Sequence, residues 1–183
     1  MKKNISFFNL HLNDKVTDYF NQKTIDDYYN TEFSTNIWCK TNKYSFLNIP
    51  KSANIFKDDF DWLQIYYENK TNKITYISGV YQDVKNIIDL RDKKFLEFKS
   101  KFDTSKLIYD HSEKVKHIDK TGDSLDNEEN FKAYEDPKNK NMIKFSCLFY
   151  EKEKNELRID FMTLEFEEFL NGEIWDSERL ENK

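Results

Sequence analysis

Apolar and polar residues alternate in two pairs of segments, which is the pattern of antiparallel hairpins. In the first pair, residues 62–67 and 73–80 are rich in β-branched and aromatic residues and flank a short polar turn. In the second pair, residues 142–150 and 156–161 are joined by a charged turn. The alternation in 142–150 places four apolar side chains on one face: Ile143, Phe145, Cys147 and Phe149. The pattern therefore predicts two hairpins.

Three further segments give weaker patterns. Residues 44–49 alternate as a strand, which the following proline ends because proline cannot donate a ladder hydrogen bond. Residues 5–12 alternate loosely and predict either a strand or a docked extended arm, followed by a short helix capped by Asn13 or Asp14. Residues 24–41 mix polar and aromatic residues without a period, so we expect irregular structure with short strands there.

Helical spacing marks two segments. An apolar stripe recurs with the helical period and predicts a long amphipathic helix with Asp83 placed to cap it. The stripe consists of Val84, Ile87, Ile88, Arg91, Phe95, Phe98 and Phe102. A final helix is predicted from a Thr163 cap to Gly172, which is placed to end it.

These elements predict the α+β class: an antiparallel sheet of two main hairpins with helices packed on one face. The strands come as antiparallel pairs separated by a long helix, without a regular β-α-β alternation. Only three glycines and two prolines occur, so a flexible linker is unsupported and we expect one domain over residues 1–183. The polar stretch 110–141 is expected to be a long loop, and residues 176–183 a frayed tail.

Charge narrows the classes of partner. The chain carries 34% charged residues and a net charge of -5, which disfavours attraction to nucleic acid and to anionic membranes. No run of residues approaches the roughly 18 apolar positions of a membrane span. Cys39 and Cys147 lie in apolar surroundings, which favours buried thiols and a cytoplasmic protein, with one long-range disulfide as the alternative. We expect a basic protein partner, with no nucleic acid and no membrane.

Residues that could carry chemistry occur without a specific arrangement. His111 and His117, with Asp110 and Asp119 nearby, do not have the spacing of common zinc-ligand pairs, so solvated loop residues are the favoured interpretation. The chain has no phosphate-binding glycine loop and no Gly-x-Ser-x-Gly elbow. Cys147 should serve packing because phenylalanines flank it two residues away on either side. We therefore expect no cofactor, no metal and no catalytic residues.

Two successions of elements carry a resemblance. Phe8-Asn9-Leu10-His11-Leu12-Asn13-Asp14 precedes a short helix, and Lys73-Ile74-Thr75-Tyr76-Ile77-Ser78-Gly79 precedes a long one. This succession resembles small uncharacterised bacterial α+β proteins, some of which are immunity partners of secreted toxins. In those proteins a glycine often follows the first strand, where this chain has Asn13. The resemblance implies the fold class and transfers no catalytic residue.

Acidity, size and this resemblance together favour a protein-binding inhibitor. The leading hypothesis is an immunity protein that neutralises a basic bacterial toxin, for example a nuclease, through an acidic surface. The candidate contact residues are acidic and fall in two groups: Asp58, Asp59 and Asp61, and Asp123, Asp126, Glu128 and Glu129. One alternative is a phage or mobile-element protein that inhibits a host nucleic-acid enzyme. A second is an enzyme with a dispersed Asp, Glu and His site. The oligomeric state stays open, although an exposed hairpin edge could pair across a symmetry axis.

Overall fold

The computed structural model of the chain describes residues 9–30, 43–99, 106–118, 124–136, 138–150 and 155–171. The helices are α1 (Val16–Tyr19), α2 (Gln22–Tyr28), α4 (Ile87–Lys99) and α5 (Leu164–Phe169), with a 3-10 turn η2 (Lys51–Ala53). The strands are β1 (Tyr44–Pro50), β2 (Trp62–Glu68), β3 (Ile74–Gln82), β4 (Lys106–Ile118), β5 (Ser124–Asp136), β6 (Asn141–Phe149) and β7 (Glu156–Thr163).

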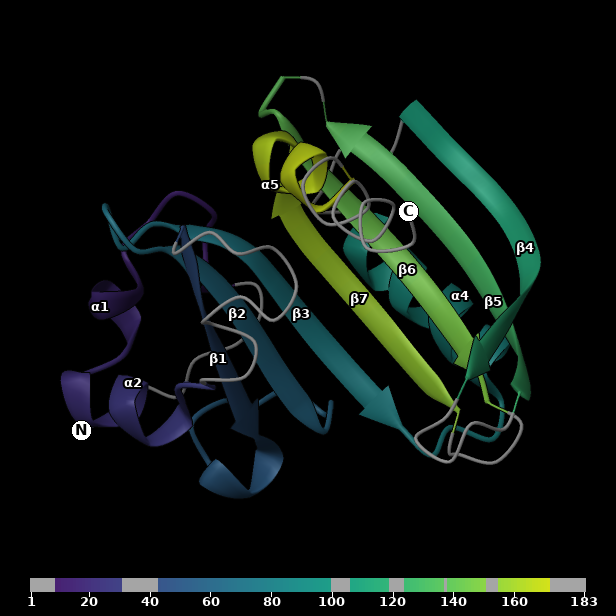
Figure 1. Ribbon diagram of the computed structural model, residues 1–183, viewed down its shortest axis with the longest axis horizontal. Coiled ribbons are helices and arrows are strands. Elements are labelled where there is room, and N and C mark those ends of the chain that lie inside the picture. The colour runs from purple at the N-terminus through teal and green to yellow at the C-terminus, as the bar shows by residue number, and fades with distance from the viewer. Residues whose placement is uncertain are drawn as a thin grey trace. The chain divides into compact units, whose positions relative to one another are not determined.

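The described strands form a seven-stranded antiparallel sheet in the order β1-β2-β3-β7-β6-β5-β4 (Figure 1). The α+β class and the antiparallel sheet are therefore confirmed. Both predicted hairpins are also confirmed, because β2 neighbours β3 and β6 neighbours β7. The packing of all helices on one face of the sheet stays a prediction.

The chain divides into two compact units, Met1–Gly79 with Met162–Lys183, and Val80–Phe161. We call them unit 1 and unit 2 and describe each by itself. The boundaries fall after Gly79 in β3 and after Phe161 in β7. The expectation of one domain over residues 1–183 stays a prediction.

The core of unit 1 is built on β1 and β2, which pair from Tyr44 opposite Glu68 to Pro50 opposite Trp62. Aliphatic side chains fill it and are almost fully buried: Leu47, Ile49, Leu63, Ile65, Ile74 and Ile77. The α5 helix adds an aromatic layer, in which the Phe166 ring lies 4.9 Å from the ring of Tyr44. Thr163 caps α5 as predicted, because its hydroxyl accepts a hydrogen bond from the Phe166 amide at 3.2 Å. Gly172, the predicted end of this helix, lies outside the described residues, as does the tail 176–183.

The N-terminal segment of unit 1 is a docked arm where it is described, and not a strand. Leu10 and Leu12 are buried. The Asn13 amide donates to the Ile74 carbonyl at 2.8 Å, and the Ile74 amide donates to the Asp14 carbonyl at 2.9 Å. Asn13 has a φ of 70°, in the left-handed region that glycine and asparagine tolerate best. Because Asn13 turns the chain in this way, the cap of α1 is Lys15 and the predicted Asn13 or Asp14 cap is wrong.

The expectation of irregular structure over 24–41 is wrong for its described beginning, where α2 extends to Tyr28. The Asn21 side chain caps this helix by accepting a hydrogen bond from the Thr24 amide at 2.9 Å. Lys23 and Asp27 form an ion pair at 2.8 Å across one helical turn. Local capping and pairing thus outweigh the poor helical period. Residues 31–41 of this prediction lie outside the described residues.

Unit 2 contains the predicted long helix as α4, which packs on β6 and β5. The rings of Phe95 and Phe98 lie 5.7 and 5.9 Å from that of Phe145, and Phe95 stacks on Tyr134 at 5.1 Å. The helix begins at Ile87, later than predicted. Asp83 cannot be its cap, because it has a φ of 59° whereas a capping residue takes the extended region.

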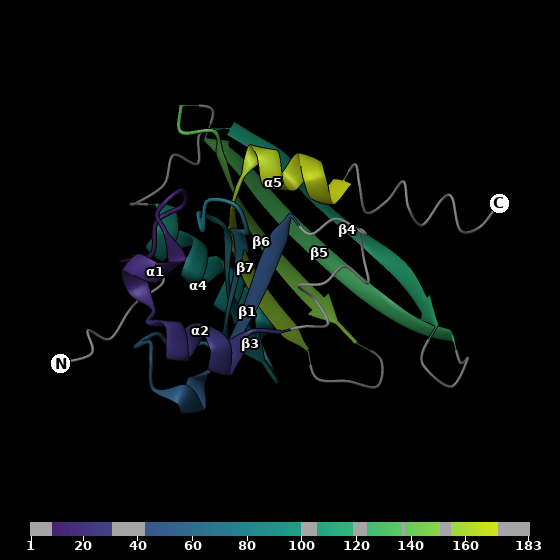
Figure 2. The ribbon, with the colours of Figure 1, turned by 60° about the vertical axis from the view of Figure 1, so that its left-hand side comes forward.

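The expectation of a long polar loop over 110–141 is wrong for the described part of that range. It folds as the hairpin of β4 and β5, paired from Lys106 opposite Glu135 to Ile118 opposite Ser124. This hairpin extends past the end of β6, because β5 pairs with β6 only from Glu128 to Asp136 (Figure 2). The sequence pattern did not predict this hairpin because polar residues occupy both faces of the two strands. The alternation that indicates a half-buried strand is therefore absent.

Candidate functional site

Three of the predicted contact residues, Asp58, Asp59 and Asp61, lie between η2 and β2 in unit 1. Asp59 is exposed, and Asp58 and Asp61 are half-buried. The Asp59 carbonyl accepts a hydrogen bond from the Lys51 ammonium at 3.0 Å, and the Asp61 carbonyl accepts one from the Lys51 amide at 2.8 Å. We call residues 58–61 the acidic segment. Its backbone is fixed at two points by one lysine.

The acidic segment is also anchored in the core of unit 1 by an aromatic ring. Phe60 is buried and stacks on Phe56, with ring centroids 4.8 Å apart. The Phe60 ring rests on Gly79 so closely that a Cβ at this glycine would lie 2.9 Å from the Phe60 Cδ1 atom. The neighbouring aspartates are therefore presented from a rigid backbone.

The second predicted group belongs to β5 in unit 2. Asp126, Glu128 and Glu129 are strand residues, and Asp123 lies outside the described residues. The register sets Glu128 opposite Lys114 and Asp126 opposite Lys116. Glu128 and Asp126 are thus matched by basic positions of β4, whereas Glu129 stands opposite Glu113.

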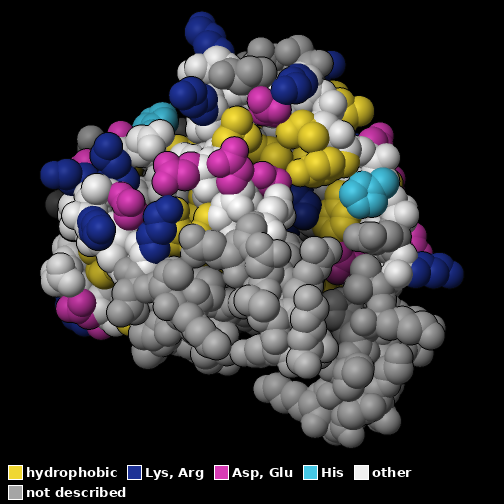
Figure 3. Space-filling view, turned by 45° about the horizontal axis from the view of Figure 1, so that its top comes forward, with side chains coloured by type: hydrophobic (Ala, Val, Ile, Leu, Met, Phe, Trp, Pro, Cys, Tyr) yellow, Lys and Arg dark blue, Asp and Glu magenta, His cyan; other side chains and the backbone are white. Residues whose placement is uncertain are grey.

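The side chains of this group that are described differ in exposure. Glu128 is exposed and accepts a hydrogen bond from the Ser112 hydroxyl at 3.1 Å, and Glu129 is half-buried. Figure 3 shows acidic and basic side chains interspersed on the face that it displays, with hydrophobic side chains gathered between them. Among the described residues on that face, no single acidic area forms.

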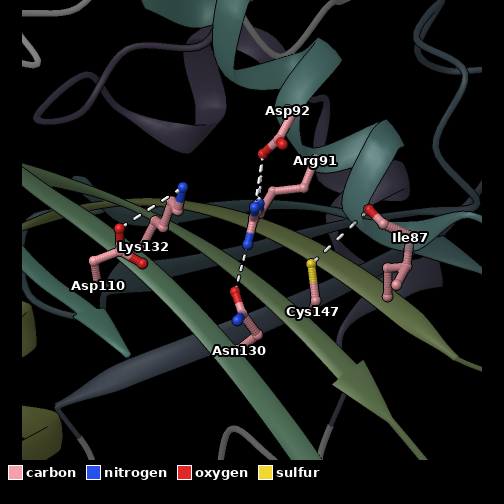
Figure 4. A network of polar contacts seen from close by, with 7 residues as sticks. All are labelled: Ile87, Arg91, Asp92, Asp110, Asn130, Lys132 and Cys147. Carbon is pink, nitrogen blue, oxygen red and sulfur yellow. Dashed lines mark hydrogen bonds and ion pairs between the residues drawn. The ribbon is translucent and has the colours of Figure 1, made fainter. Parts of the chain in front are cut away.

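A buried polar network lies between α4 and the sheet of unit 2 (Figure 4). Arg91 points from α4 toward β5, where its Nη1 donates a hydrogen bond to the Asn130 side-chain oxygen. Its Nε and Nη2 donate to Asp92 at 2.9 and 2.7 Å. The Arg91 side chain is only 6% exposed, whereas that of Asp92 is 58% exposed. The guanidinium is thus buried and hydrogen-bonded on both sides.

Sequence reasoning placed Arg91 on the apolar stripe but did not find its partner. An arginine at a core position is itself a signal, because a buried charge requires hydrogen-bonding groups around it. Asn130 could not be assigned as that partner while its segment was expected to be a loop. Nearby, Lys132 and Asp110 form an ion pair at 3.7 Å between β5 and β4.

Cys147 is a buried free thiol beside this network. Its Sγ donates a weak hydrogen bond to the Ile87 carbonyl at 3.9 Å. Burial raises the pKa of the Cys147 thiol to about 11, although the nearby Arg91 charge acts in the opposite direction. Because the thiolate is the reactive form, the raised pKa keeps Cys147 in its less reactive thiol form at neutral pH. Cys39 lies outside the described residues.

The histidines do not converge with other metal ligands in the part of the chain that is described. His11 and His111 are exposed, and His11 belongs to unit 1 whereas His111 belongs to unit 2. No group of three or more His, Cys, Asp or Glu side chains among the described residues could hold a metal ion. No described helix has both the length and the apolar character needed to cross a membrane.

Comparison with protein-family models, with curated proteins and with solved structures finds no match for this chain. The candidate site consequently rests on the geometry of the acidic segment and of the β4–β5 hairpin.

Proposed function

We propose that this chain is a protein-binding inhibitor, an immunity protein that neutralises a basic bacterial toxin. The observation that carries the proposal is the acidic segment, in which three carboxylates occupy four consecutive residues on an anchored backbone. Fixed charges of one sign accelerate association with a partner of the opposite sign. A backbone that is already ordered loses little conformational entropy when it binds.

The residue that follows the acidic segment suits the same role. Trp62 opens β2 and is half-buried, with its backbone opposite Pro50. Tryptophan is enriched among residues that dominate binding energy, because it buries a large apolar area at small entropic cost. An interface of acidic residues around this aromatic anchor would combine electrostatic attraction with apolar burial.

Glu128 and Glu129, with Asp126 and Asp123, are proposed as a second and weaker contact. Lysines stand opposite Glu128 and Asp126 in the hairpin register. Opposite charges in adjacent positions reduce the field that reaches a partner, and salt screens what remains. We therefore expect reversals in β5 to slow association only slightly.

The test uses the genes that flank the gene of this chain. Each is expressed alone in a bacterial host and again together with this chain, and growth is recorded. The proposal predicts one flanking gene whose product arrests growth alone and is tolerated in the presence of this chain. If no flanking product is both toxic and neutralised, the proposed function is wrong.

Matched charge reversals then test the surface. Asp58→Lys with Asp59→Lys should abolish protection and slow association of the purified proteins at least tenfold at low salt. Glu167→Lys with Glu168→Lys is the control, because it also reverses two adjacent acidic residues of unit 1. Circular dichroism establishes that both variants fold. Equal protection by both variants would remove the acidic segment from the interface.

A further inference from the structure

The two edge strands of the sheet differ in how they are covered. At one end, β1 is bridged by Tyr29 opposite Leu47, and its Phe46 carbonyl accepts a hydrogen bond from the Asn30 amide at 2.9 Å. At the other end, β4 has β5 as its only neighbour among the described strands. Large apolar side chains are exposed on β4, with Leu107 50% and Ile108 37% exposed. An edge of this length is a template for another strand.

The hairpin also has a portion without support from a third strand. Residues 115–118 and 124–127 pair with each other, whereas β6 pairs only with Glu128–Asp136 of β5. A two-stranded ribbon is marginally stable in water on its own. A strand added to the outer edge of β4 around Ser112 would lie next to the start of this ribbon.

We propose that β4 pairs antiparallel with β4 of a second copy of this chain, about a two-fold axis at Ser112. With the axis normal to the sheet, opposite residues lie on the same face, so their numbers must differ by an even step. An axis at Ser112 sets Asp110 opposite Lys114 of the second copy. On the other face it sets His111 opposite Glu113 of the second copy. This proposal does not depend on the proposed inhibitor function.

The charges of this pairing extend across four strands. Lys114 already stands opposite Glu128, and Asp110 opposite Lys132, within each hairpin. Across the dimer, one row then reads Glu128, Lys114, Asp110 of the second copy and Lys132 of the second copy. Its signs alternate throughout, and the two-fold axis repeats it. Opposite charges in directly opposite positions stabilise paired strands.

Neighbouring registers lack this complementarity. An axis at Asp110, Glu113 or Lys114 would set that charged residue opposite its own copy, and like charges directly opposite are destabilising. An axis at His111 brings no opposite charges together over the regular part of the strand. A shift of register between Leu107 and Tyr109 interrupts the ladder. The pairing is consequently confined to the residues around Ser112, which favours one register.

Self-association is tested on the full chain by sedimentation over a concentration series at low salt. The native chain should move from monomer to dimer as concentration rises. Asp110→Lys and Lys114→Asp should each remain monomeric at the same concentrations, because each sets two pairs of like charges across the axis. An equimolar mixture of these two variants should dimerise again, since both pairs across the axis of the mixed dimer are of opposite charge.

The recovery in the mixture separates a lost interface from a lost fold. Asp89→Lys makes the same charge change at an exposed position of α4 and should dimerise like the native chain. A native chain that stays monomeric throughout would overturn the proposal. A dimer that tolerates Asp110→Lys would overturn it as well, because the interface would then lie elsewhere.

A cysteine at the axis tests the register directly. Opposite residues of antiparallel strands have Cα atoms about 4.5–5.5 Å apart, which is within the range of a disulfide. Ser112→Cys should therefore form a covalent dimer on mild oxidation, whereas Lys138→Cys, on the exposed turn before β6, should not. Equal cross-linking of both variants, or of neither in a dimeric sample, would contradict the Ser112 axis.

Discussion

Asn130→Ala isolates the hydrogen bond that holds the buried Arg91 guanidinium to β5. The substitution removes the side-chain oxygen that accepts from Arg91 Nη1 and leaves that N–H group inside unit 2. A hydrogen bond to a charged group contributes about 1.5–3 kcal/mol. The remaining partner, Asp92, is 58% exposed, so its ion pair is screened by water and offsets little of the loss.

The expected loss is large enough to measure by unfolding. For a chain of this length, a loss of about 1.5–3 kcal/mol lowers the melting temperature by roughly 3–12 °C. Far-ultraviolet circular dichroism during thermal and urea unfolding gives both the midpoint and the free energy of unfolding. Asn139→Ala, an exposed asparagine of the turn before β6, is the control and should change stability by less than about 0.5 kcal/mol.

A second substitution, at Arg91, tests whether Asn130 stabilises the fold through its bond to the guanidinium. Arg91→Met removes the buried charge while retaining most of the side-chain volume, and it leaves the exposed Asp92 carboxylate in water. In the Arg91→Met variant, Asn130→Ala leaves no buried guanidinium without its acceptor. The substitution should therefore lower the free energy of unfolding by at least about 1 kcal/mol less than it does in the native chain. If Asn130→Ala costs the same in both backgrounds, the bond to Arg91 is not what Asn130 contributes.

Four further substitutions test unit 1 by unfolding. Gly79→Ala should lose about 1–3 kcal/mol, because its Cβ would lie 2.9 Å from a buried ring carbon that must then shift. Ser78→Ala should be neutral or stabilising, since the buried Ser78 hydroxyl has no hydrogen-bond partner among the described residues. Ser45→Ala should lose about 0.5–1.5 kcal/mol, because the Ser45 hydroxyl is hydrogen-bonded. Burial and the hydrogen bond to Asp14 raise the pKa of Tyr19 to about 12. The folded state therefore holds this proton more tightly than the unfolded state. The free energy of unfolding of the native chain should fall as the pH rises from 10 to 12, and that of the Tyr19→Phe variant should fall less over the same range.

The elements with a buried face were predictable from the sequence. β2 shows the alternation that burial on one face requires, and Phe95 and Phe98 recur on the helical stripe that packs on Phe145. Thr163 was found because capping is local in sequence. Asp83 shows the limit of such local rules, because its positive φ is set by the path of the chain from β3 to α4 and not by its neighbours in sequence.

The candidate contacts were harder to predict than the core. Acidic residues can be counted in a sequence, but their surroundings depend on which strand they join. The acidic segment kept the character expected of it, because Phe60 and Lys51 fix its backbone locally. Glu128 does not match its expectation, because its segment is a strand in which Lys114 stands opposite Glu128. The partner of a surface charge in a sheet is a long-range property that spacing does not reveal.

The polarity that concealed the β4–β5 hairpin also determines how its register is chosen. A half-buried strand is held in register because a slip by one residue would expose its apolar face. The unsupported end of this hairpin lacks that constraint, and charge takes its place: Lys116 stands opposite Asp126 there, and Lys114 stands opposite Glu128 where β6 begins to pair. The register of a second β4 about Ser112 would be selected by the same charges. High salt should therefore weaken the proposed dimer and loosen the end of the hairpin together, while leaving the apolar packing of α4 on β6 in place.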